Sequence, residues 1–171
     1  MTPKSIAATG TLEEAEESAW ADIRARLRAM SPYEFQDLVA ALLEAMGYHV
    51  AWIAPPGPDR GIDIVAGIDP LGIKDPRIKV QVKHRPDTRT SPDQLRSFMA
   101  VLSGKDVGIF VASGGFTRDT ETEARTQENR RITLIDLERL VELWIEHYDE
   151  VGDAQRLLLP LRPVHYLNTK S

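Results

Sequence analysis

The chain has 171 residues, 42% of them hydrophobic and 27% charged, with a formal net charge of −5, and these values suit one globular domain with a hydrophobic core. It contains no cysteine, which excludes disulfides and cysteine-ligated zinc. No apolar run reaches the roughly 20 residues that span a bilayer, and no basic-then-apolar signal opens the chain, so we expect a cytoplasmic protein without membrane contact.

Residues 1–30 are predicted to form an N-terminal tail followed by an acidic amphipathic helix. Thr11 and Glu14 have the spacing of a capping box, which predicts a helix from Leu12 to about Ala29. The apolar stripe of this helix comprises Leu12, Ala19, Trp20, Ile23 and Leu27. We expect the helix to pack on the core or on another subunit.

A second helix is predicted to begin after Ser31, an N-cap residue followed by proline, and to end at Gly47. Glu34 and Gln36 flank the apolar stripe of this helix on opposite sides. Only one of them can therefore lean toward a neighbouring sheet. The capping box with Ser31 accounts for Glu34 as a structural residue, and a supporting role at the site is the alternative for it.

Two segments of alternating character, residues 58–65 and 78–83, predict a β-hairpin closed by the turn-forming residues 69–72. In a strand, successive side chains point to opposite faces of the sheet. We therefore expect Ile62 and Ile64 to share one side of the first strand.

The other face of the predicted hairpin is polar. Asp63 lies on it in the first strand, and Lys79, Gln81 and Lys83 share it in the second. Mg²⁺ prefers oxygen ligands, and the carboxylate of Asp63 and the amide oxygen of Gln81 can supply two. Lys83 would then lie beside the metal and its phosphate ligand. The alternative is a half-exposed hairpin whose outer face is simply polar.

Basic residues gather in and around the second strand, although the chain as a whole is acidic. Lys79, Arg85 and Arg89 are candidates for contacts to DNA phosphates, because affinity for nucleic acid comes largely from lysine and arginine. Aspartates in the same stretch leave an ordinary solvated face as the alternative.

The second half of the chain predicts alternating strands and helices. A helix follows the N-cap Ser91, and the apolar run 107–112 predicts a strand buried on both faces. A glycine turn, a polar helix to about Glu128, a strand at 132–135 and a helix from Leu137 complete the pattern. This order predicts an α/β domain with a mixed central β-sheet flanked by helices. Residues 149–171 are expected to form an apolar tail packed on the domain or on a partner.

Three motifs carry a resemblance to a known family: Gly57–Ile64, Val80–Lys83 and Gly115–Thr117. Together they resemble the catalytic domain of Mrr-type restriction endonucleases, in the PD-(D/E)xK nuclease superfamily, over about residues 31–148. The resemblance implies a restriction-endonuclease-like core and a DNA endonuclease that depends on Mg²⁺ or Mn²⁺ and acts in restriction or phage defence. The alternative function is an inactive module of this fold that binds DNA or a defence-system partner.

The resemblance also implies roles for individual residues. Asp63, the Gln81 oxygen and the Val82 carbonyl would hold the metal, and Lys83 would orient the attacking water. Gln36 stands where the superfamily often has a glutamate, so the site has one carboxylate fewer.

Asp59 is a candidate for a compensating carboxylate, although a role in the turn before Gly61 is the simpler interpretation.

Cleavage of both strands of a duplex needs two sites, so we expect a homodimer or larger assembly. A separate protein is a candidate for target recognition, because the only segment before the nuclease domain is a single helix.

Overall fold

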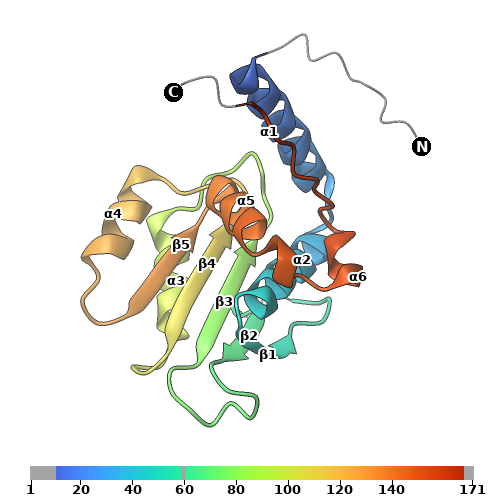
Figure 1. The fold of residues 1–171 in the computed structure, drawn as a ribbon. Coiled ribbons are helices and arrows are strands. Elements are labelled where there is room, and N and C mark those ends of the chain that lie inside the picture. Colours follow the sequence, from blue (N-terminus) through green and yellow to red (C-terminus); the bar gives the residue numbers. More distant parts are fainter. Residues whose placement is uncertain (1–10, 59–60, 168–171) are drawn as a thin grey trace.

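A five-stranded mixed sheet forms the centre of the computed structural model, which describes residues 11–58 and 61–167 (Figure 1). The strands lie in sequence order: β1 (His49–Ile53), β2 (Ile64–Gly67), β3 (Ile78–Lys83), β4 (Val107–Ala112) and β5 (Arg131–Ile135). The first three strands pair antiparallel, and β3, β4 and β5 pair parallel. The α/β architecture and the mixed sheet predicted from the sequence are thus confirmed.

Helices cover both faces of the sheet (Figure 1). The helical elements are α1 (Leu12–Ala29), α2 (Pro32–Ala45), α3 (Pro92–Ala100), α4 (Arg118–Thr126), α5 (Leu137–Glu146), the 3-10 turn η1 (Tyr148–Glu150) and α6 (Asp153–Arg156). One hydrophobic core joins α2 and α5 to the sheet, with Phe35 and Trp144 fully buried in it. A second core packs α3 against the opposite face, around Phe98 and Phe110.

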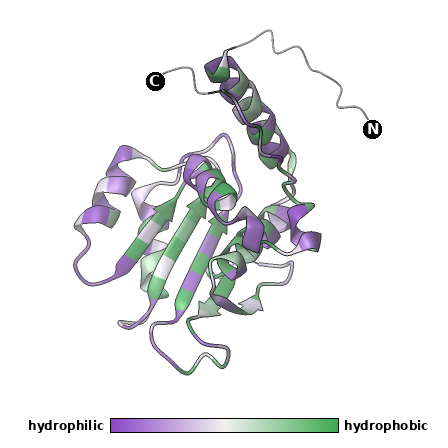
Figure 2. Cartoon of the chain, in the orientation of Figure 1, coloured by the Kyte–Doolittle hydropathy of each residue, from purple (hydrophilic) through white to green (hydrophobic). Residues whose placement is uncertain are grey.

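Strand β4 lies between the two cores. Its Val111 belongs to the core under α2 and α5, whereas Phe110 and Ala112 belong to the core under α3. In Figure 2 the strands are largely hydrophobic, whereas α4 is largely hydrophilic. An apolar strand covered on both faces explains why residues 107–112 show no polar alternation.

Helix α1 projects from the rest of the domain (Figure 1). Of its apolar stripe only Leu27 is fully buried, while Trp20 and Ile23 are partly buried against the first core. Because most of the helix is exposed, it contributes little to the core. None of the helices in the described part of the chain is long and apolar enough to cross a membrane.

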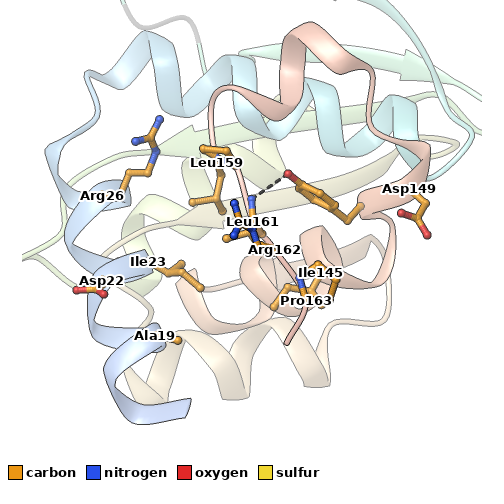
Figure 3. Close-up of a pocket in the computed structure, with 12 residues that line it drawn as sticks. Ala19, Asp22, Ile23, Arg26, Ile145, Asp149, Leu159, Leu161, Arg162 and Pro163 are labelled. Carbon is orange, nitrogen blue, oxygen red and sulfur yellow. Dashed lines mark hydrogen bonds between the residues drawn. The ribbon is translucent and has the colours of Figure 1, made fainter. Parts of the chain in front are cut away.

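The C-terminal segment returns along α1 and closes a mainly apolar cavity of about 640 Å³ (Figure 3). The Arg26 guanidinium donates to the carbonyls of Leu157 and Leu158, at 2.9 and 2.8 Å. The Trp144 indole N–H donates to the Leu159 carbonyl at 3.0 Å.

Beyond these contacts the Leu161 N–H donates to the Tyr148 hydroxyl at 2.8 Å (Figure 3). The expected tail therefore packs on its own chain as far as residue 161. Residues 1–10 of the expected N-terminal tail lie outside the described residues.

Candidate active site

The predicted hairpin is formed by β2 and β3. Its register pairs Ile64 with Val80 and Val65 with Lys79. The turn forms because the Asp69 carboxylate accepts hydrogen bonds from the backbone N–H groups of Ile73 and Lys74, at 3.1 and 3.0 Å. These bonds hold the pKa of Asp69 below its ordinary value, with the Lys74 bond as the largest cause.

Asp63 lies one residue before β2 and is held by backbone hydrogen bonds. Its N–H donates to the Val80 carbonyl at 2.8 Å, and its carbonyl accepts from the Ala54 N–H at 2.7 Å. Its Oδ2 accepts from the Val82 N–H at 2.6 Å. Continued by one residue, the register of the hairpin sets Asp63 opposite Gln81. The carboxylate is therefore fixed at the start of the strand.

The prediction that Ile62 and Ile64 share one side of the strand is wrong. Ile64 is fully buried in the core under α2 and α5, whereas Ile62 packs against the core under α3. Strand β2 begins only at Ile64, and Asp63 occupies a bend. The two-residue period therefore does not extend across Asp63.

Gln81 and Lys83 alternate with apolar residues along β3. The parallel register pairs Gln81 with Phe110 and Lys83 with Ala112, so both polar side chains belong to the face of the sheet that bears α3. Gln81 is 6% exposed, while Lys83 is partly buried. The backbone thus brings together Asp63, Gln81 and Lys83, the three residues predicted to converge.

Gln36 is connected to Asp63 through the backbone of Ala54. The side-chain amide of Gln36 is 8% exposed and donates to the Ala54 carbonyl at 3.0 Å. The N–H of Ala54 in turn donates to the Asp63 carbonyl. Gln36 therefore lies on the side of α2 that faces the sheet.

Glu34 has the other role predicted for this helix. Its carboxylate accepts from the Ser31 N–H at 2.7 Å and completes the capping box. Asp59, the candidate for a compensating carboxylate, lies outside the described residues.

His84 is a site residue that the sequence analysis missed. Its ring stacks on Phe35, with ring centroids 4.4 Å apart. Its two ring nitrogens lie 3.0 Å from the Ser113 hydroxyl and 2.9 Å from the Met30 carbonyl. Burial lowers the pKa of His84, against the opposing effect of the Met30 hydrogen bond. In the sequence, the only indication that His84 belongs to the site was its position directly after Lys83.

These contacts fix the end of β3. The Ser113 N–H donates to the Lys83 carbonyl at 3.0 Å, and His84 contacts both the Ser113 side chain and the segment between α1 and α2. The main chain of Lys83 is thus anchored on β4 on one side and, through His84, on the start of α2. Such anchoring limits the positions available to the Lys83 ammonium.

The three candidate DNA-contacting residues have different surroundings. Lys79 forms an ion pair of 2.8 Å with Asp106, whose side chain is only 5% exposed. Burial disfavours the charged form of Asp106, but hydrogen bonds from Lys79 and Ser103 outweigh it and hold its pKa below the ordinary value. Arg85 and Arg89 are exposed on the loop that follows β3.

The oxygen atoms around Asp63 suit a hard divalent cation. Asp63 Oδ2 is engaged by Val82, and the amide of Gln81 provides a further oxygen on the neighbouring strand. In an extended strand the N–H and C=O of one residue point to the same side, so the Val82 carbonyl also points toward Asp63. The described residues contain no group of three or more His, Cys, Asp or Glu side chains suited to hold a metal. Among the described residues, Asp63, Gln81 and Val82 could offer such a cation one carboxylate, one amide oxygen and one carbonyl oxygen.

Comparisons with known proteins identify the family and the fold. The family model of the Mrr-type catalytic domain, described as a restriction endonuclease, matches residues 27–144. Among solved structures, the MspJI restriction endonuclease in complex with a 27-mer oligonucleotide is similar, with a TM-score of 0.60 and 20% identity over 87% of this chain. The DNA modification-dependent restriction endonuclease AspBHI is also similar, with a TM-score of 0.60 and 16% identity over 92% of this chain.

The similarity covers only part of those two proteins. The chain spans 36% of the length of the MspJI chain and 44% of the AspBHI chain. No curated protein matches the sequence. The likeness to the solved structures therefore concerns the fold of one portion of each enzyme.

Proposed function

The chain belongs to the Mrr-type restriction endonuclease family, and on this premise we propose that it is a metal-dependent endonuclease that hydrolyses phosphodiester bonds in DNA. The observation that supports the proposal is the register of β2 and β3, which sets Asp63 opposite Gln81 and places Lys83 on the same face. A role in restriction or phage defence is part of the proposal.

Asp63, the Gln81 oxygen and the Val82 carbonyl would hold Mg²⁺ or Mn²⁺. When bound, such an ion supplies a water of lowered pKa and neutralises charge on the scissile phosphate. Asp63 would bind the cation through the carboxylate whose Oδ2 already accepts from Val82. Gln81, buried on the neighbouring strand, would hold its amide oxygen in place without adding charge.

Lys83 would orient the attacking water and stabilise the negative charge that develops on the phosphate. A preorganised charge stabilises a transition state better than a mobile one, because no reorganisation is needed during the reaction. The anchoring of the Lys83 carbonyl by Ser113, and of His84 by Met30 and Ser113, supports this role. His84 is a positioning residue in this scheme.

We propose that DNA lies over the end of β3, where Arg85 and Arg89 are exposed. Lys79 is the third proposed phosphate contact, although its ammonium is shared with Asp106. Target recognition is proposed to come from another segment or a separate protein, because the chain spans less than half of each similar restriction endonuclease. Double-strand cleavage is proposed to need a homodimer or larger assembly.

A nuclease assay on supercoiled plasmid tests the proposal. Wild type should cut in Mg²⁺ or Mn²⁺ and not in EDTA, and a variant lacking the Lys83 ammonium should not cut. Equal cleavage by wild type and variant would show that the assigned site is wrong. Light scattering on the same preparation tests the assembly, since a monomer whose double-strand cleavage is first order in protein contradicts the dimer.

The second candidate is a catalytically inactive module that binds DNA or a defence partner. The neutral side chain of Gln36 favours it, because it occupies a position where the superfamily often has a carboxylate. Metal-independent DNA binding together with no cleavage under any divalent cation would support this candidate over the nuclease.

A further inference from the structure

A groove lined by arginines lies at the carboxyl ends of the parallel strands, outside the cation site. It consists of two adjoining cavities of about 430 and 350 Å³, which share Arg89, Gly114, Gly115 and Asp136. Arg118 lines the first cavity, and Arg24 and Arg28 of α1 line the second. We call this the arginine groove. Of its arginines, the proposed function uses only Arg89.

The arginine groove lies next to the strand that carries the candidate catalytic residues. Ser113 lines it, and the N–H of Ser113 donates to the carbonyl of Lys83 at 3.0 Å. The groove therefore adjoins the main chain of Lys83.

Two arginines of the groove have no structural partner among the residues that the structure describes. Neither Arg89 nor Arg118 forms an ion pair or a side-chain hydrogen bond there, in contrast to Arg28, which pairs with Asp87. Arg24 lies over the Trp20 ring, 5.0 Å from its centroid. A structural arginine normally has an acceptor for its guanidinium, so Arg89 and Arg118 are available to a ligand.

The backbone brings Arg89 and Arg118 close to each other. Arg89 precedes Thr90 and Arg118 follows Thr117, and the Thr117 N–H donates to the Thr90 carbonyl at 3.1 Å. The buried Thr120 hydroxyl donates to the same carbonyl at 2.9 Å. These bonds hold the loop after β3 against the start of α4, and both arginines line the same cavity.

Gly114 makes this arrangement possible. A Cβ at this position would lie 2.1 Å from the Thr88 carbonyl oxygen and 2.3 Å from that of Arg85. The loop that carries Arg85 and Arg89 therefore rests directly on the backbone of the turn after β4. Since both sides of this contact are main chain, the base of the two arginines is rigid.

Carboxylates in the arginine groove restrict the kind of ligand. Glu121, Asp136 and Glu138 also line it, and Asp136 caps α5 by accepting from the Arg139 N–H at 2.9 Å. The charges in the groove nearly balance, so a multiply charged anion would be repelled by the carboxylates. A singly charged phosphodiester that pairs directly with guanidinium groups suits it better.

We propose that Arg89 and Arg118 together bind one phosphodiester group of the DNA backbone, distinct from the scissile one. The proposal rests on the proposed function, because it takes DNA as the substrate. Guanidinium groups bind phosphate oxygens through paired N–H donors. Two such groups on one phosphate would fix the position of the backbone relative to Lys83.

Binding of a labelled DNA duplex, followed by fluorescence anisotropy in EDTA over a range of salt concentrations, tests the proposal without any cleavage. Arg89→Ala and Arg118→Ala should each weaken binding but change the slope of log K against log salt little, because one arginine still contacts the phosphate in each single variant. The double variant should lower the slope by about 0.9, the value for one phosphate.

Arg125→Ala is the matched control, because Arg125 is exposed on the same helix as Arg118 and lines neither cavity. It should leave the slope unchanged. Arg118→Lys keeps the charge but not the planar fork, and we expect it to retain the slope while weakening the affinity. Thermal unfolding of each variant checks that the fold is intact.

Several results would overturn the proposal. A slope of the double variant equal to that of Arg125→Ala would show that Arg89 and Arg118 contact no phosphate, even if the protein cuts DNA. Absence of DNA binding by wild type would do the same. At constant ionic strength, inorganic phosphate that weakens DNA binding by wild type and not by the double variant would support a phosphate contact at these arginines, whereas equal competition for both proteins would show that phosphate acts elsewhere.

Discussion

The Val82 N–H donates to Oδ2 of Asp63 at 2.6 Å, and this bond joins the start of one hairpin strand to the end of the other. It occupies one oxygen of the carboxylate and fixes the orientation of the group. The remaining oxygen is then directed by the backbone rather than by side-chain rotation. A carboxylate held in this way loses little conformational freedom on binding a cation.

Asp63→Asn and Asp63→Ala separate the charge of Asp63 from its structural bond. Asparagine can still accept from Val82, whereas alanine cannot. Both variants should lower the cleavage rate by on the order of 10² or more, because the anionic ligand is lost. Alanine should lower the free energy of unfolding by about 1 kcal/mol more than asparagine does, because only asparagine keeps the bond from Val82. Plasmid cleavage and thermal unfolding measure the two effects, and full cleavage by Asp63→Asn would contradict the assignment.

Lys83 and Lys79 lie on one face of β3 and give a matched pair of variants. Lys83→Met should abolish cleavage and leave the fold intact. Lys79→Met should instead leave the buried Asp106 carboxylate without its ammonium partner and cost roughly 2 kcal/mol of stability. Chemical denaturation and the nuclease assay distinguish the two. Normal stability of Lys79→Met would mean that its ion pair contributes nothing to folding.

Much of the fold follows from local signals. The capping boxes at Thr11, Ser31 and Ser91 mark the starts of three helices, and each predicted start agrees with the structure. The run 107–112 coincides with β4. A strand that is covered on both faces is continuously apolar, and this run shows that pattern. These elements depend on interactions within a few residues.

Long-range contacts could not be read in the same way. The bond between Arg26 and the carbonyls of Leu157 and Leu158 joins segments 131 and 132 residues apart, and no periodicity encodes it. The pairing of Lys79 with Asp106 depends on the parallel register of β3 and β4. The bend at Asp63 escaped prediction because alternation alone does not reveal where a strand begins.

His84 gives the stability of the metal-free protein a pH dependence. Burial lowers its pKa below the ordinary value of 6.5, so the unfolded chain takes up a proton that the folded chain does not. Its contribution to stability is complete above the unfolded pKa and is lost as the pH falls toward the folded pKa. Denaturation in EDTA between about pH 7.5 and pH 5.5 should show wild type losing stability at up to about 1.4 kcal/mol per pH unit more than His84→Gln. Parallel curves for the two proteins would exclude His84 as the source.

Gln36→Glu tests whether the neutral side chain on α2 supports Asp63 or leaves a metal position unfilled. In the metal-free protein a glutamate would lose the N–H that donates to Ala54 and place a carboxylate against that carbonyl. We expect a loss of roughly 1–3 kcal/mol of stability in EDTA. Added Mg²⁺ should restore more stability to the variant than to wild type, because ligand charge strengthens binding of a hard cation.

Glu34→Gln is the control, because Glu34 lies on the other side of the apolar stripe of α2. Its amide oxygen can still accept from Ser31, so this variant should lose about 1 kcal/mol or less, with no dependence on Mg²⁺. Calorimetric titration of Mg²⁺ into both variants complements the unfolding curves. If Gln36→Glu binds Mg²⁺ no better than wild type while remaining destabilised, Gln36 acts only through Ala54 as a structural support of Asp63. If Glu34→Gln abolishes metal binding instead, the side of α2 that contributes to the metal site is the one that bears Glu34.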